Sequence, residues 1–154
     1  MNGRPESEQW IELYAFVPFR LNRLATGVSE YLAAIYQERF GLDLPQWRIM
    51  ATVGARACTA QHIAGSTRMH KTRVSRAIAQ LEARDLIERA SNERDRRERQ
   101  VRLTKAGRRL YAELVPLALE REGALLTCLT PGQLQGFLEG LQVLERFLHL
   151  DEQP

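Results

Sequence analysis

The chain has 154 residues, 44% of them hydrophobic, which is enough for one domain with an apolar core. Its apolar runs stay well short of the roughly 18 residues that span a bilayer, and its polar N-terminus does not resemble a secretory signal. We therefore expect a cytoplasmic protein without a membrane segment. The net charge of +3 is small but uneven, because residues 68–109 hold 14 Lys and Arg against 6 Asp and Glu. A basic middle between acidic ends is typical of a polyanion-binding surface, although a solvated basic face remains the alternative.

The two cysteines, Cys58 and Cys128, lie far apart in the sequence and form no C-x-x-C pair. This spacing argues against a disulfide framework or a thiolate metal site. We expect both to be buried, unreactive thiols, with a redox sensor as the alternative.

The first half of the chain predicts helices. Apolar residues recur every three or four positions from Val17 to Tyr36, which indicates an amphipathic helix. Pro18 either starts this helix or kinks it, and residues 10–16 are expected to form a shorter helix before it. Pro45 opens a second helix that runs to about Arg56.

The second half predicts two helices, a hairpin and two more helices. Thr59 can cap a helix through residue 66, and residues 70–84 form the next one. Residues 86–89 and 100–103 alternate in polarity and predict strands around a polar loop. Thr104 can cap a long helix to about Cys128, and Thr130 followed by Pro131 starts the last helix.

This order predicts a mainly α fold with a small antiparallel wing of two or three strands, that is, a winged helix-turn-helix with a helical dimerisation region. Three parts are expected along the chain. Residues 1–40 form an N-terminal dimerisation region, residues 41–103 form the winged helix-turn-helix lobe, and residues 104–154 complete the dimerisation region.

The helix over residues 70–84 has two contrasting faces. Val74, Ala77, Ile78 and Leu81 cluster on one side and should pack inward. The other side carries cations, hydroxyls and an amide, without an acidic residue between positions 70 and 80: Lys71, Thr72, Arg73, Ser75, Arg76 and Gln80. Arginine forks suit guanine edges, and hydroxyls suit bases or phosphates, so this face predicts a DNA-reading helix.

The polar loop between the two strands is dense in arginine. Its four arginines, Arg94, Arg96, Arg97 and Arg99, can lie along a DNA backbone or enter a minor groove, where negative potential is concentrated. Asp95 would repel phosphate on its own, so we expect it to pair with Arg97 and orient it.

These segments together resemble successive signatures of the MarR family of transcriptional regulators. The matching stretches are Leu44-Pro45-Gln46-Trp47-Arg48-Ile49-Met50, Lys71-Thr72-Arg73-Val74-Ser75-Arg76, Leu86-Ile87-Glu88-Arg89, Asp95-Arg96-Arg97 and Val101-Arg102-Leu103-Thr104-Lys105-Ala106-Gly107. The resemblance spans about residues 13–148. It implies a homodimer on a pseudo-palindromic operator, with interlocked first and last helices, and often a small aromatic effector between lobe and dimer region. It also implies repression, recognition-helix roles for residues 71–76, and a wing-tip role for Arg97 oriented by Asp95.

Two positions depart from that pattern. Arg68 stands where the family commonly has a glycine in the turn, and Asp85 replaces the glycine that usually ends the recognition helix. Aspartate tolerates a left-handed conformation better than most residues. Arg68 either contacts a phosphate or belongs to a different turn. His70 lies where a helix cap or a phosphate contact would be.

The remaining patterns do not indicate an enzyme or a cofactor. The sequence lacks a glycine-rich phosphate loop, an H-E-x-x-H motif, a nucleophile elbow and a metal-ligand spacing of histidines. Trp47 and Arg48 are the candidate effector residues, because an aromatic plate beside a cation suits an aromatic carboxylate, although a core tryptophan beside a surface arginine is the simpler interpretation. An architectural DNA-coating protein and a protein-interaction module are the alternative functions.

Overall fold

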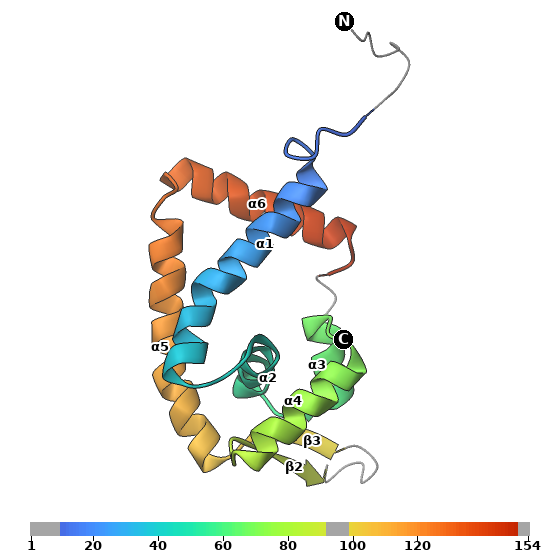
Figure 1. Cartoon of the computed structure of the whole chain (residues 1–154), viewed down its shortest axis with the longest axis vertical. Helices are drawn as coiled ribbons and strands as arrows, with labels where there is room; N and C mark the ends of the chain where they lie inside the picture. Colours follow the sequence, from blue (N-terminus) through green and yellow to red (C-terminus); the bar gives the residue numbers. More distant parts are fainter. Residues whose placement is uncertain (1–9, 92–98, 151–154) are drawn as a thin grey trace, which may run out of the picture.

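The computed structural model describes residues 10–91 and 99–150, and these form a mainly helical fold with one small sheet (Figure 1). The elements in chain order are α1 (Val17–Ala34), the π-helix η1 (Ile35–Arg39), α2 (Leu44–Ala55), β1 (Cys58–Thr59), α3 (Ala60–Thr67), α4 (Lys71–Ala83), β2 (Ile87–Ser91), β3 (Arg99–Leu103), α5 (Lys105–Leu126) and α6 (Pro131–Phe147). The three strands are antiparallel in the order β1-β3-β2. This confirms the predicted winged helix-turn-helix architecture.

The predicted helix starts are confirmed by their capping bonds. The side chains of Thr59, Thr104 and Thr130 accept hydrogen bonds from the first-turn amides of α3, α5 and α6. Asp43 caps α2 in the same way, because its carboxylate accepts a hydrogen bond from the Gln46 amide. The Gln46 side-chain oxygen in turn accepts a hydrogen bond from the Asp43 amide. Such caps satisfy amides that have no partner inside the helix, which is why these boundaries are readable from the sequence.

Two predictions about the N-terminal region are corrected. Residues 10–16 do not form a helix, because Phe16 is extended (φ −73°, ψ 113°) and only a turn around residues 13–15 precedes α1. Of the two roles predicted for Pro18, starting the helix is confirmed, because Pro18 lies in the first turn of α1. The predicted helix to Tyr36 ends instead at Ala34, and the chain continues as η1.

The buried core lies in the lobe formed by α2, α3, α4 and the sheet. Ile49, Ile63, Leu81 and Leu114 are fully buried there, which joins α2, α3, α4 and α5 in one cluster. Thr104 fixes the start of α5 to the end of α4, because its amide donates to Leu86 O and its hydroxyl to Asp85 O. The lobe of α2, α3, α4 and the sheet is therefore packed as one unit with the first turns of α5.

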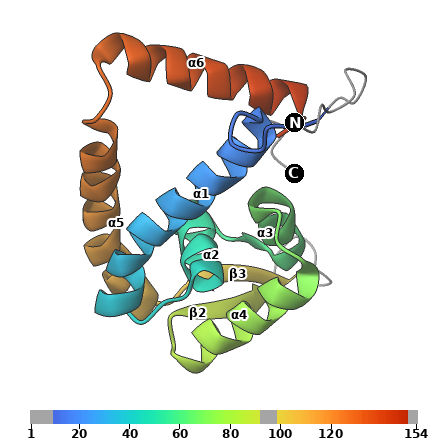
Figure 2. The same ribbon diagram turned by 45° about the horizontal axis from the view of Figure 1, so that its top comes forward.

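In contrast, α1 and α6 contain no buried residue, although they have 18 and 17 residues. Figure 2 shows α6 running from the top of α5, apart from the α2–α4 lobe, while α1 crosses the molecule diagonally. Their exposed apolar side chains include Leu24 (52% exposed), Leu138 (47%) and Phe147 (78%). None of the helices in the described part of the chain has the length and apolar character needed to cross a membrane.

The cysteines differ from each other. Cys58 is buried in β1, and burial raises the pKa of its thiol, with the Arg56 charge opposing that shift. The prediction that Cys128 is buried was wrong, because this residue is exposed in the turn between α5 and α6.

Candidate nucleic-acid interface

The turn from α3 to α4 is defined by three consecutive residues with different tasks. Arg68 ends α3 in the left-handed conformation (φ 52°), which reverses the chain. Met69 is buried and anchors the turn to the core. His70 is the N-cap of α4, where its Nδ1 accepts a hydrogen bond from the Thr72 amide at 3.3 Å. Arg68 thus takes a conformation that a glycine adopts without cost.

The two faces of α4 agree with the prediction. Val74, Ala77, Ile78 and Leu81 are buried, and the opposite face is open to solvent. All of its predicted DNA-reading side chains are exposed: Lys71, Thr72, Arg73, Ser75 and Arg76. Within the described residues no carboxylate forms an ion pair with the three cations of this face. This face therefore presents positive charges and hydrogen-bond donors without an acidic partner in the described part of the chain.

The C-terminal end of α4 is bound to the segment that precedes α2. Arg84 donates hydrogen bonds from Nη1 to Gly41 O at 2.7 Å and from Nη2 to Phe40 O at 2.8 Å. One turn earlier, Gln80 Oε1 accepts a bond from Gln46 Nε2 at 3.1 Å. Helix α4 is thereby attached at two points, to the segment between η1 and α2 and to the first turn of α2.

Two ion pairs hold the hairpin of β2 and β3. Arg102 Nε lies 2.9 Å from Glu88 Oε1 across the strands, and Arg89 Nε lies 3.2 Å from Glu82 Oε1 on α4. The predicted wing residues Arg94, Asp95, Arg96 and Arg97 lie outside the described residues, whereas Arg99, the fourth arginine of the predicted loop, is the first residue of β3 and is exposed. Their roles, including the pairing of Asp95 with Arg97, stay predictions.

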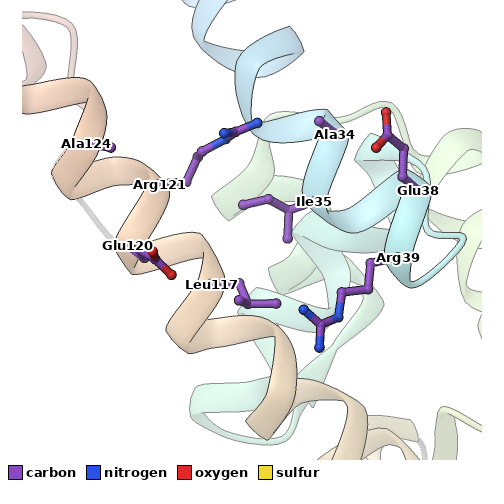
Figure 3. Close-up of a pocket in the computed structure, with 8 residues that line it drawn as sticks. All are labelled: Ala34, Ile35, Glu38, Arg39, Leu117, Glu120, Arg121 and Ala124. Carbon is purple, nitrogen blue, oxygen red and sulfur yellow. The ribbon is translucent and has the colours of Figure 1, made fainter.

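A pocket of about 460 Å³ lies between the end of α1, η1 and α5 (Figure 3). Ile35 and Leu117 point toward one another between the helices, and Arg121 reaches from α5 toward α1. The Arg121 guanidinium lies 4.4 Å from the centre of the Tyr31 ring, and its buried Nε has no hydrogen-bond partner within the described residues. The other lining residues are Ala34, Glu38, Arg39, Glu120 and Ala124.

The two residues expected to bind an effector do not line this pocket. Trp47 is half-buried and stacks on Tyr36, with ring centres 6.0 Å apart and an interplanar angle of 11°. Burial raises the pKa of Tyr36, and the charge of Arg48 opposes that shift. The structure thus shows Trp47 as a packing partner of Tyr36.

Sequence reasoning missed Arg84 and Arg121 because neither lies in a recognisable motif. Arg84 acts through backbone carbonyls 43 and 44 residues away in the chain. Arg121 reaches its site only because α5 packs beside α1. A long helix with an arginine on an otherwise apolar stripe gives no local signal that distinguishes this residue from a solvated one.

Comparisons with known proteins agree with this architecture. The model of the MarR family matches residues 40–98, and no curated protein sequence matches significantly. Among solved structures, a MarR/EmrR family transcriptional regulator from Acinetobacter sp. ADP1 is 26% identical, with a TM-score of 0.81 over 90% of this chain and 99% of that one. MepR from S. aureus, solved in complex with DNA, is 22% identical, with a TM-score of 0.74 over 86% of this chain and 99% of that one.

BpsR from Bordetella bronchiseptica, whose DNA binding is regulated by 6-hydroxynicotinic acid, is 23% identical, with a TM-score of 0.73 over 94% of this chain and 98% of that one. The likeness to MepR and BpsR shows the fold. The family match covers the winged lobe, and the likeness to the Acinetobacter regulator extends over nearly the whole chain. On this evidence the lobe of residues 40–98 matches the MarR family, and the chain as a whole has the fold of MarR-family transcriptional regulators.

Proposed function

We propose that this regulator binds double-stranded DNA sequence-specifically through the exposed face of α4. The carrying observation is the composition of that face, where Arg73 and Arg76 lie exposed without an acidic partner in the described chain. Arginine forks can read guanine edges, whereas a solvated helix normally mixes acids among its bases. Lys71, Thr72, Ser75 and the cap residue His70 supply further contacts, as Arg68 does from the turn. The DNA complex of MepR supports this mode for the shared fold.

The acting species is a homodimer that contacts a pseudo-palindromic operator and represses transcription. The absence of buried residues in α1 and α6 supports a dimer, since two such helices need a second apolar surface to cover them. A two-fold axis places two α4 helices in successive major grooves on one face of the duplex, which explains a palindromic site.

The pocket between η1 and α5 is the proposed effector site. Its apolar walls suit a ring, and the buried, unpartnered Nε of Arg121 suits an acceptor such as a carboxylate. Glu38 and Glu120 at the same pocket require that the ligand also carries a donor group. An aromatic acid with a ring N–H or hydroxyl meets both needs, and 6-hydroxynicotinic acid, the regulator of BpsR, has that chemistry.

The DNA proposal is tested by selecting duplexes from a random library with the purified protein. We expect one palindromic consensus, and Arg73→Ala or Arg76→Ala should lose about 1–3 kcal/mol on that duplex and less on random DNA. Equal loss on both DNAs would mean that these arginines touch only phosphate. A protein that enriches no sequence is an architectural coating protein, and one that binds no DNA is an interaction module.

The effector proposal is tested with 6-hydroxynicotinic acid as the probe, by calorimetry on the wild type and on Arg121→Met. We expect the variant to bind the acid at least tenfold more weakly than the wild type does, because it loses a charge-assisted hydrogen bond of about 1.5–3 kcal/mol. Arg109→Met, at an exposed position of the same helix α5, is the matched control. Binding that is equal in all three proteins would remove the pocket from the proposal.

A further inference from the structure

The π-helix η1 forms one wall of the proposed effector pocket. Ile35, Glu38 and Arg39 of η1 line this wall, and α5 lines the opposite one (Figure 3). Single π-turns are rare and occur frequently at functional sites, because their widened hydrogen bonding can rearrange. A ligand in the pocket therefore touches the element whose backbone is best able to change.

The end of η1 is closed by two backbone hydrogen bonds. The Gly41 amide donates to Gln37 O at 3.0 Å, and the Leu42 amide donates to Tyr36 O at 2.8 Å. Gly41 has φ 61°, a left-handed conformation that glycine adopts without cost. The carbonyl groups of Phe40 and Gly41 belong to this closed turn, so they move when η1 moves.

Arg84 binds both of these carbonyl groups from the C-terminal end of α4. Its Nη1 donates to Gly41 O at 2.7 Å and its Nη2 donates to Phe40 O at 2.8 Å. The guanidinium is a rigid fork, so two bonds from it fix an orientation as well as a distance. Helix α4 packs chiefly on α2, α3 and β2, whereas η1 packs chiefly on α1 and α5. The side chain of Arg84 thus joins the pocket wall to a helix that packs elsewhere.

We infer that Arg84 is the positioning residue that couples the effector pocket to α4, an inference that rests on the proposed effector and DNA-binding functions. A ligand shifts a distant element only by the difference in its affinity for two arrangements of the protein. Here that difference arises at η1, and Arg84 transfers the position of the turn after η1 to the last turn of α4.

The test measures the coupling as the ratio of the dissociation constants for the selected duplex with and without 6-hydroxynicotinic acid. In the wild type we expect this ratio to differ from one by about fivefold or more. In Arg84→Met it should approach one although the acid still binds, because Arg84 does not line the pocket. The lost positive charge affects both dissociation constants equally and cancels in the ratio.

Arg108→Met is the matched control. Arg108 is also exposed, and its Nη1 also donates to a backbone carbonyl, Leu103 O, at 2.8 Å. That bond joins α5 to β3 and leaves η1 and α4 untouched. The ratio in this variant should equal the wild-type ratio, and unfolding curves check that both variants are folded.

Leu117→Trp tests the coupling without a ligand, because its larger ring fills the pocket beside Ile35. This substitution should change the DNA affinity of the otherwise wild-type protein and have almost no effect in the Arg84→Met protein. The NMR shifts of the amides of residues 77–83 give the same comparison in the absence of DNA.

The inference is overturned if Arg84→Met keeps the wild-type ratio, because the coupling then runs through another contact, such as the stack of Tyr36 on Trp47. It is also overturned if Arg108→Met loses the ratio equally, if bound acid leaves the DNA affinity of the wild type unchanged, or if Leu117→Trp alone shifts neither the DNA affinity nor the α4 amides.

Failure of the proposed functions looks different. A wild type that does not bind 6-hydroxynicotinic acid contradicts the effector proposal, and a wild type that enriches no duplex contradicts the DNA proposal. In either case the comparison of Leu117→Trp with and without Arg84 still decides whether this arginine couples the pocket to α4.

Discussion

At the scale of single residues, Gly107 shows how closely the chain approaches itself. A Cβ at this position would overlap the carbonyl oxygen of Leu86, the same oxygen that accepts a hydrogen bond from the Thr104 amide. The first turn of α5 therefore rests directly on the backbone that begins β2. Gly123, later in the same helix, has open space where its Cβ would be.

These two glycines predict opposite effects of one substitution. Gly107→Ala should lower the free energy of unfolding by about 1–3 kcal/mol, because backbone must shift to accept the methyl group. Gly123→Ala should raise it by about 0.5–1 kcal/mol, because alanine loses less conformational entropy in a helix. Urea unfolding of both variants measures the two changes in the free energy of unfolding. An unchanged free energy of unfolding in Gly107→Ala would show that the contact with Leu86 relaxes freely.

At the scale of elements, α4 is bounded at each end by a left-handed residue that is not glycine. Arg68 has φ 52° and Asp85 has φ 55°. These are the two positions at which the resemblance predicted glycine, so the backbone conformation is kept although the residue differs. A left-handed backbone costs most residues about 1–2 kcal/mol, and aspartate less. The strain therefore falls chiefly on Arg68, at the end of α3 and in the turn that leads to α4.

Replacing the strained residue should separate stability from binding. Arg68→Gly should raise the free energy of unfolding by roughly 1 kcal/mol, and Asp85→Gly should raise it by less. If Arg68 contacts a phosphate, as proposed, Arg68→Gly should nevertheless bind both selected and random DNA more weakly. Unfolding curves and DNA titrations of the two variants test this, and unchanged DNA affinity would make Arg68 only a turn residue.

The elements were predictable where the causes are local. Thr59, Thr104 and Thr130 begin helices because hydroxyl caps act within one turn, and the buried face of α4 follows from its spacing. The π-helix η1 and the strand β1 were not predictable, because the first depends on packing against α5 and the second on pairing with β3. The exposed face of α4 was identified from the sequence, whereas the pocket at Arg121 depends on the packing of α5 beside α1 and η1.

At the scale of the whole molecule, the exposed apolar side chains gather on α1 and α6. Leu21, Leu24, Leu138, Leu144 and Phe147 are each at least 41% exposed. Burying such side chains stabilises an association by about 25 cal/mol for each Å² removed from water. An isolated chain would instead present a hydrophobic surface larger than monomeric proteins usually tolerate.

We therefore expect sedimentation at micromolar concentration to give twice the chain mass of 17.7 kDa. Leu138→Glu together with Leu144→Glu should shift the protein toward the monomer, because buried carboxylates would lack partners. Ala79→Glu on the exposed side of α4 adds a charge outside α1 and α6 and should leave the dimer intact. A well-folded wild-type monomer would contradict the dimer.

The attachment of α4 to the chain around residues 40–46 has a consequence for local unfolding. Arg84 and Gln80 hold the last turns of α4 to Phe40, Gly41 and Gln46. The Leu42 amide in turn donates to Tyr36 O at 2.8 Å, which closes the end of η1. We therefore expect η1 and the end of α4 to fray together, so that their amides report one free energy of opening in hydrogen–deuterium exchange. In an Arg84→Met protein the two segments would exchange independently, and the DNA-reading helix would open without disturbing the pocket.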